Sequence, residues 1–142
     1  MPYYGLGSEE AIFADLYTQV STITRLKTID WQRAARMEAD QSRYPGVYIN
    51  YLDVEKTKLL KDLFENVLSV ALVAWVWAGD RENLGTLMNT MIDDLEAAVI
   101  ADPYRDSNAY DTEIRIVATD GGSQHPQGQV IMNLVITFYS ED

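Results

Sequence analysis

The first hydrophobic pattern along the chain has spacings of three and four residues, which is the period of an amphipathic helix. Ser8 can cap the start of this helix, and Glu9 and Glu10 occupy the first turn, where the helix dipole favours carboxylates. We therefore predict a helix over residues 9–27. Its apolar stripe comprises Ile12, Phe13, Leu16, Val20 and Ile23.

The middle of the chain is rich in β-branched and aromatic residues, which favour strands. After a Pro-Gly pair, residues 47–52 alternate in the manner of a strand. Residues 56–78 are ambiguous, because leucines at helical spacing lead into a run that is apolar on both faces. We favour two strands, 57–64 and 67–78, joined by a turn near 62–66, over one continuous helix. The second strand is expected to be buried on both faces.

The clearest helical pattern follows this run. Asp80 is a good N-cap, and residues 81–101 carry one uninterrupted apolar stripe until Asp102 and Pro103 stop the helix. The stripe comprises Leu84, Leu87, Met88, Met91, Ile92, Leu95 and Val99, with Asp93, Asp94 and Glu96 on the opposite face.

The chain ends with two segments in which apolar and polar residues alternate, 112–119 and 130–139. A polar, glycine-containing loop over residues 120–128 separates them. The predicted order of elements is therefore α-β-β-β-α-β-β. This order indicates an α+β fold with an N-terminal helix, a mainly antiparallel sheet of about five strands and one long amphipathic helix packed on it. The length of 142 residues fits a single domain, residues 1–142.

Composition argues against most kinds of catalytic and metal site. The chain has no cysteine and one histidine, His125, which excludes thiolate metal sites, a thiol nucleophile and histidine-rich metal centres. Adjacent carboxylates such as Asp93 and Asp94 diverge on a helix, so they do not converge on a substrate. Gly121 and Gly122 are not followed by the Lys-Ser/Thr of a phosphate-binding loop. We predict no catalytic, cofactor-binding or metal-binding residues and no enzymatic activity.

The charge is acidic, with 11 basic and 22 acidic residues and a net charge of −11. Residues 79–142 hold most of this excess, and binding to a phosphate backbone would need clustered Lys and Arg instead. The start of the chain has neither the basic nor the apolar region of a signal peptide. The most apolar run, residues 67–78, is too short to span a bilayer. We expect a protein that is made in the cytoplasm, with no membrane partner.

Residues 28–44 have poor hydrophobic periodicity but contain aromatic residues among arginines. Tyr, Trp and Arg are enriched at protein–protein hot spots, so this segment is a candidate contact element. A short helical turn packed on its own domain explains the composition equally well. The candidate interface residues are Trp31, Arg33, Arg36 and Arg43.

The order of elements resembles that of the tail terminator, or tail completion, proteins of long-tailed bacteriophages. In that family an N-terminal helix precedes a strand that follows a proline, an apolar strand of a hairpin, a long amphipathic helix and two final strands. The resemblance covers nearly the whole chain and lies in its architecture, while residues 28–44 match no pattern of the family. The corresponding segments are 9–27, 45–49, 67–78, 81–101, 112–119 and 130–139.

The resemblance implies a structural virion protein of the tail and neck, assembled in the host cytoplasm without a cofactor. Members of this family form six-membered rings that cap the last layer of the tail tube and stop its polymerisation. The ring offers a surface to the neck or head–tail connector, and DNA passes through its centre without specific binding. The partners implied are further copies of the chain, the tail tube protein and the connector.

Two other classes of function stay open at the level of the residues. An acidic binding module could mimic nucleic acid through its strongly negative second half. A small enzyme could use carboxylates around His125, in which case turnover would be lost on His125→Ala.

Overall fold

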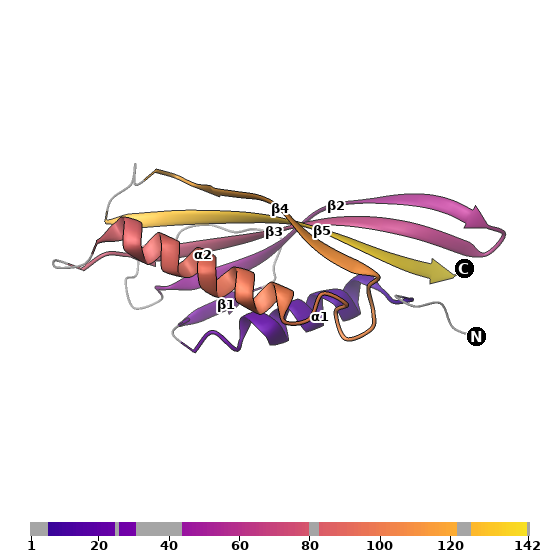
Figure 1. Cartoon of the computed structure of the whole chain (residues 1–142), viewed down its shortest axis with the longest axis horizontal. Coiled ribbons are helices and arrows are strands. Elements are labelled where there is room, and N and C mark those ends of the chain that lie inside the picture. Colours follow the sequence, from indigo (N-terminus) through magenta and orange to yellow (C-terminus); the bar gives the residue numbers. More distant parts are fainter. Residues whose placement is uncertain (1–5, 25, 31–43, 80–82, 122–125, 142) are drawn as a thin grey trace.

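The computed structural model describes residues 6–24, 26–30, 44–79, 83–121 and 126–141. The elements in chain order are α1 (Glu9–Val20), β1 (Thr28–Asp30), β2 (Gly46–Leu60), β3 (Leu63–Trp77), α2 (Leu84–Ile100), β4 (Asp111–Thr119) and β5 (Gln127–Glu141). This is the predicted order, α-β-β-β-α-β-β, and the α+β class is confirmed (Figure 1).

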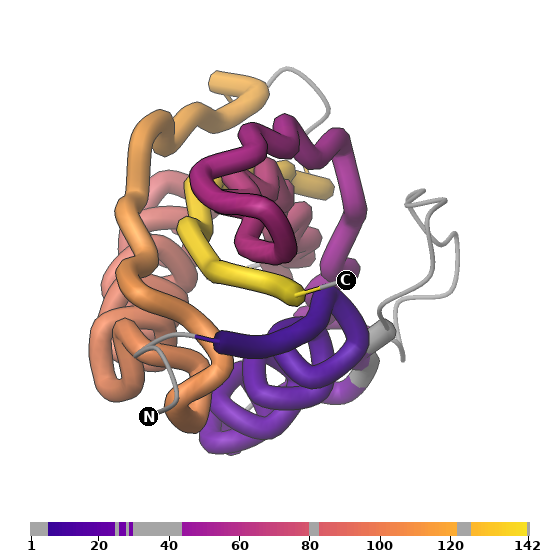
Figure 2. Tube along the Cα trace, turned by 90° about the vertical axis from the view of Figure 1, so that its right-hand side faces the viewer, coloured from indigo at the N-terminus to yellow at the C-terminus, as the bar shows by residue number. Residues whose placement is uncertain are grey.

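The strands form one sheet in the order β1-β2-β3-β5-β4. β1 pairs with β2 in parallel, and the other three pairings are antiparallel. Both helices lie on the same side of the sheet (Figure 1). The start of the described chain runs beside the end of β5, where the Gly7 N–H donates a hydrogen bond to the Tyr139 carbonyl at 2.9 Å (Figure 2).

The prediction of separate strands at 47–52 and 57–64 is wrong, because a single strand, β2, runs from Gly46 to Leu60, and residues 63–64 already belong to β3. The register against β3 shifts between Tyr51 and Asp53, which marks a β-bulge at Leu52. A bulge moves the alternation by one residue, so two apolar patterns of different phase belong to one strand. The hairpin turn lies at residues 61–62 rather than 62–66, and β1 supplies the additional strand of the predicted order.

The prediction that the strand over 67–78 is buried on both faces is confirmed from residue 70 to residue 76 of β3. Alternate side chains of a strand point to opposite faces, and each face of β3 has its own apolar cluster. Val70, Leu72, Ala74 and Val76 belong to the large core beneath the helices. Ala71, Val73 and Trp75 pack with Tyr44 and Tyr48 on the other face.

Both helices are shorter than predicted. α1 ends at Val20 rather than at residue 27, because the Ser21 and Thr22 hydroxyls donate to the carbonyls of Tyr17 and Gln19, both at 2.6 Å. Such local bonds from hydroxyl side chains compete with helix continuation.

α2 begins at Leu84 rather than at residue 81, and its N-cap is Asn83 instead of Asp80. The Asn83 side-chain oxygen accepts a hydrogen bond from the Thr86 N–H at 3.0 Å, which satisfies a backbone donor of the first turn. Asp80 lies outside the described residues.

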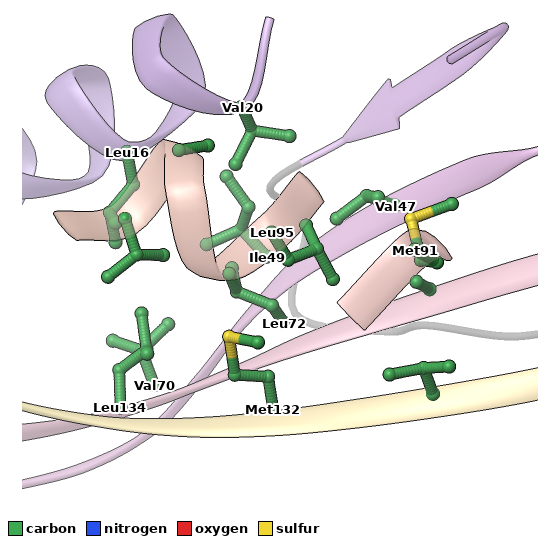
Figure 3. Close-up of a cluster of buried hydrophobic side chains, with 14 of the residues drawn as sticks. Leu16, Val20, Val47, Ile49, Val70, Leu72, Met91, Leu95, Met132 and Leu134 are labelled. Atoms are coloured by element: carbon green, nitrogen blue, oxygen red, sulfur yellow. The ribbon is translucent and has the colours of Figure 1, made fainter. Parts of the chain in front are cut away.

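The main core is formed between the helices and the sheet (Figure 3). It joins residues of α1, α2 and the three central strands, and many of its side chains are completely enclosed. Its labelled members in Figure 3 are Leu16, Val20, Val47, Ile49, Val70, Leu72, Met91, Leu95, Met132 and Leu134. No helix in the described part of the chain has both the length and the apolar character needed to cross a membrane.

Candidate functional site

The predicted interface residues Trp31, Arg33, Arg36 and Arg43 lie outside the described residues, as does His125. The described chain resumes at Tyr44, which is buried and whose ring lies 5.5 Å from that of Trp77. The role of residues 28–44 in an interface therefore stays a prediction.

Two β-strands extend well beyond the helices as a hairpin, which we call the arm and define as residues 52–68 (Figure 1). The β2 half of the arm is exposed apart from Val54, and Leu60 near its tip is 59% exposed. The Lys56 ammonium lies 4.6 Å from the centre of the Phe64 ring, a cation–π contact within the arm. The last residues of β5 pair with the β3 half of the arm.

Both borders of the sheet have long free edges among the described strands. On the side of β2 away from β3, β1 pairs only with Gly46, Val47 and Tyr48, and no other described strand lies there. β4 forms the opposite border and is exposed along most of its length. Of nine exposed large hydrophobic side chains in the described chain, five lie on these two strands: Leu52, Leu59, Leu60, Ile116 and Val117. Free edges with apolar side chains are sites at which other strands can add.

The sheet face away from the helices carries acidic residues at both borders. Directly opposed residues of paired strands share a face, so the pairings place Asp53, Ser69, Val135 and Glu113 in one row across the sheet. The next row contains Glu55, Val67, Thr137 and Asp111. The central members of both rows are only half-buried. From Tyr48 and Val73 towards the tip of the arm, this face of the sheet is therefore half-exposed and carries four carboxylates in its two rows.

The loop between α2 and β4 is held by a charged side chain that no hydrophobic pattern indicates. Arg105 is completely enclosed, its Nε lies 3.4 Å from a carboxylate oxygen of Asp15 in α1, and its guanidinium also donates to the carbonyls of Val99 and Asp102. Arg105, Asp106 and Ser107 all have positive φ, which is unusual for residues other than glycine. A long-range contact thus fixes an otherwise strained loop against α1.

Burial shifts the pKa values of both Asp15 and Arg105. Desolvation raises the pKa of Asp15 to about 6, although the Arg105 guanidinium opposes the shift. Burial also lowers the pKa of Arg105, and Asp15 and Asp102 oppose that change. This cluster anchors the loop between α2 and β4 against α1.

The described residues contain no group of three or more side chains placed to hold a metal ion. Their distinctive surface features are the arm, the two sheet edges and the acidic rows, all of which suit contacts between macromolecules. The sequence predicts a sheet, and therefore edges for assembly, but not which strands form them, because that depends on the order in which distant strands pair.

No protein-family model and no curated protein matches the chain. Among solved structures, the chain is similar to a component described as "Virion of native gene transfer agent (GTA) particle". The two share 10% sequence identity over 94% of this chain and 95% of the other, with a TM-score of 0.47. At this distance the similarity concerns the course of the backbone.

Proposed function

We propose that this chain is a structural virion protein of the tail-terminator type. Copies of it form a ring, with six members as in the family it resembles, that caps the tail tube, ends its polymerisation and joins the tail to the neck or head–tail connector. The observation that carries the proposal is the pair of edges, on β2 and β4, that stay free at opposite borders of the sheet among the strands that the structure describes. The element order on which the resemblance rests supports it.

A subunit that binds its neighbours through two different surfaces makes head-to-tail contacts. Such contacts either close into a ring or continue as a filament. A protein that ends the growth of a tube has to close. The free edges and the apolar residues along them provide the contacts that such a ring needs.

The acidic rows give the ring a suitable inner or rim surface for DNA to pass. A negative wall repels phosphates, so DNA slides past it without adhering and without being read. The partners are further copies of the chain, the tube protein and the connector, and the role requires neither a cofactor nor catalysis. The protein acts in the virion, at the junction of tail and neck.

The mass of the purified protein in solution, followed by imaging of the particles and of tube ends, tests the proposal. We expect a closed oligomer in solution or, if closure requires the tube, rings at tube ends. A species that stays monomeric at high concentration and also fails to bind tube ends would overturn it.

The acidic rows also fit a second function, that of an inhibitor that mimics nucleic acid. Such a protein would act as a soluble monomer and would compete with DNA for a nuclease or a regulator. The mass together with the imaging of tube ends separates the two functions, because a mimic forms no ring in solution or on a tube.

A further inference from the structure

We propose that the arm of one copy of this chain stacks face to face on the arm of a second copy, with a basic face against an acidic face. The inference rests on the proposed function, in which it adds a contact between neighbours in the ring. It follows from the way in which charged side chains are divided between the two faces of the arm.

One face of the arm is basic. Lys56 and Lys58 of β2 oppose Asn66 and Phe64 of β3, and the alternation along β3 places them on the side of the sheet where the helices lie. Both lysines are exposed. The Lys56 ammonium lies over the Phe64 ring, and no carboxylate in the described part of the chain forms an ion pair with either lysine. This face therefore carries two cations that the described carboxylates do not neutralise.

The opposite face of the arm is acidic. Glu55 of β2 opposes Val67, and Glu65 of β3 opposes Thr57, so both carboxylates lie on the side away from the helices. Glu55 is exposed and Glu65 is half-buried, where the Tyr139 hydroxyl donates a hydrogen bond to it at 3.5 Å. No Lys or Arg of the described chain forms an ion pair with either carboxylate.

The two charged faces lie at the same level along the arm. Glu55 directly precedes Lys56 on β2, and the row that contains Glu65 lies between Lys56 and Lys58. A rotation about an axis parallel to the arm keeps every residue at its level. In a ring of identical copies, the lysines of one arm therefore come level with the carboxylates of the next. Opposite charges at matching levels favour this contact and suppress the contact between two like faces.

A second copy matches the basic face better than a phosphate backbone does. Three of the four lysines of the chain lie at residues 56–61, within a chain whose net charge is −11. Binding to a phosphate backbone needs several clustered cations, whereas the basic face supplies two lysines. An identical arm supplies the two carboxylates that pair with them.

Stacking also buries apolar surface. Phe64 on the basic face, and Val67 and Tyr139 on the acidic face, are half-buried in the single copy. Side chains of two sheets that pack face to face interdigitate across about 10 Å. The arm extends beyond the helices, so a neighbouring arm can reach its faces (Figure 1). Because strands twist along their length, the faces of the arm are rotated relative to the sheet beneath the helices, and contact between arms is compatible with contact through the borders.

Charge reversal tests the contact between arms. Lys56→Glu with Lys58→Glu makes both faces acidic, and Glu55→Lys with Glu65→Lys makes both faces basic. The mass of each double variant is measured in solution and its particles are imaged at tube ends, alone and as an equimolar mixture of the two.

Thermal unfolding of each variant shows whether it is folded. The single changes Lys58→Glu and Glu55→Lys, at exposed positions, replace any double variant that is not. Lys27→Glu is the matched control for Lys58→Glu, because it reverses the charge of an exposed lysine outside the arm.

We expect each double variant alone to lose the rings that the wild type forms in solution or on tube ends, because like-charged faces would then meet. The mixture should regain rings, since the two variants can alternate around six positions, and Lys27→Glu should assemble as the wild type does. Rings from either double variant alone would overturn the inference while leaving the proposed function standing. A mixture that forms no rings would do the same, and would indicate a different partner for the arm. Absence of rings from the wild type, both in solution and on tube ends, would overturn both.

Discussion

Arg105 shows how one residue can hold two distant parts of the fold. Its guanidinium is enclosed between α1 and the loop that follows α2, and Asp15 is the carboxylate beside it. A buried charge is tolerated only when it is paired and hydrogen-bonded. The ion pair with Asp15 and the hydrogen bonds to the carbonyls of Val99 and Asp102 hold Arg105 in a loop in which three successive residues have positive φ angles.

We expect Arg105→Ala to lower the free energy of unfolding by about 3–5 kcal/mol, because it leaves Asp15 buried without its partner. Urea denaturation measures the change. Arg115→Ala is the matched control, since the Arg115–Glu113 ion pair has the same chemistry with side chains that are 61% and 51% exposed. Its loss should cost less than about 1 kcal/mol. Equal losses in the free energy of unfolding for the two changes would show that Arg105 does not hold the loop against α1.

The buried carboxyl also predicts a pH dependence. The pKa of Asp15 is raised from 3.8 to about 6 in the folded state by desolvation, against the pull of Arg105. The folded protein therefore binds this proton more tightly than the unfolded chain. The contribution of Asp15 to stability is greatest below about pH 4 and falls as the pH rises to about 6, by at most about 3 kcal/mol.

Thermal unfolding of the wild type and of Asp15→Asn across this range isolates the effect. The asparagine resembles the protonated acid and does not titrate. The wild type should lose stability relative to the variant between about pH 4 and pH 6. Parallel profiles would contradict the raised pKa.

Among the helices and strands, local hydrophobic patterns predict those elements whose faces keep the same surroundings along their length. The apolar stripe of α2 and the doubly buried run of β3 were both read from the sequence. Local patterns failed at β2, where the bulge at Leu52 reverses the phase of alternation inside one strand. They also missed β1, three residues long, which pairs with a strand that begins sixteen residues later.

The candidate site was less predictable than the fold for a physical reason. Which strands form the borders of the sheet can be stated only when the order β3-β5-β4 is known. That order is set by contacts between residues that are distant in the sequence. The burial of Arg105 likewise depends on Asp15, ninety residues earlier in the chain. The arginine-rich segment was singled out by composition alone, and its residues lie outside the described part.

For that segment we expect Arg33→Ala with Arg36→Ala to weaken assembly far more than it lowers the melting temperature of the monomer. Truncating one member of a desolvated charge pair costs about 2–5 kcal/mol, against less than about 1 kcal/mol for a surface pair. Trp31→Ala should act in the same way if Trp31 anchors the interface, and should destabilise the isolated fold if it belongs to the core. Intact assembly and tail completion by these variants would remove the segment from the mechanism.

At the scale of the whole molecule, the net charge of −11 and the acidic rows predict weak interaction with DNA. Titration of a labelled duplex, followed by fluorescence anisotropy at several salt concentrations, should show no specific binding and no sequence preference. A protein that grips the phosphate backbone loses affinity steeply as salt rises. Micromolar affinity with such a slope would contradict a channel through which DNA slides.

We propose above that the chain ends the growth of a tail tube, and the polymerisation of purified tube protein shows whether it does. Polymerising tubes are imaged by electron microscopy with and without this protein, and their length distribution and ends are compared. We expect added protein to halt elongation and to leave a ring on one end of each tube. Tubes that keep growing at the same rate, with bare ends, would contradict it.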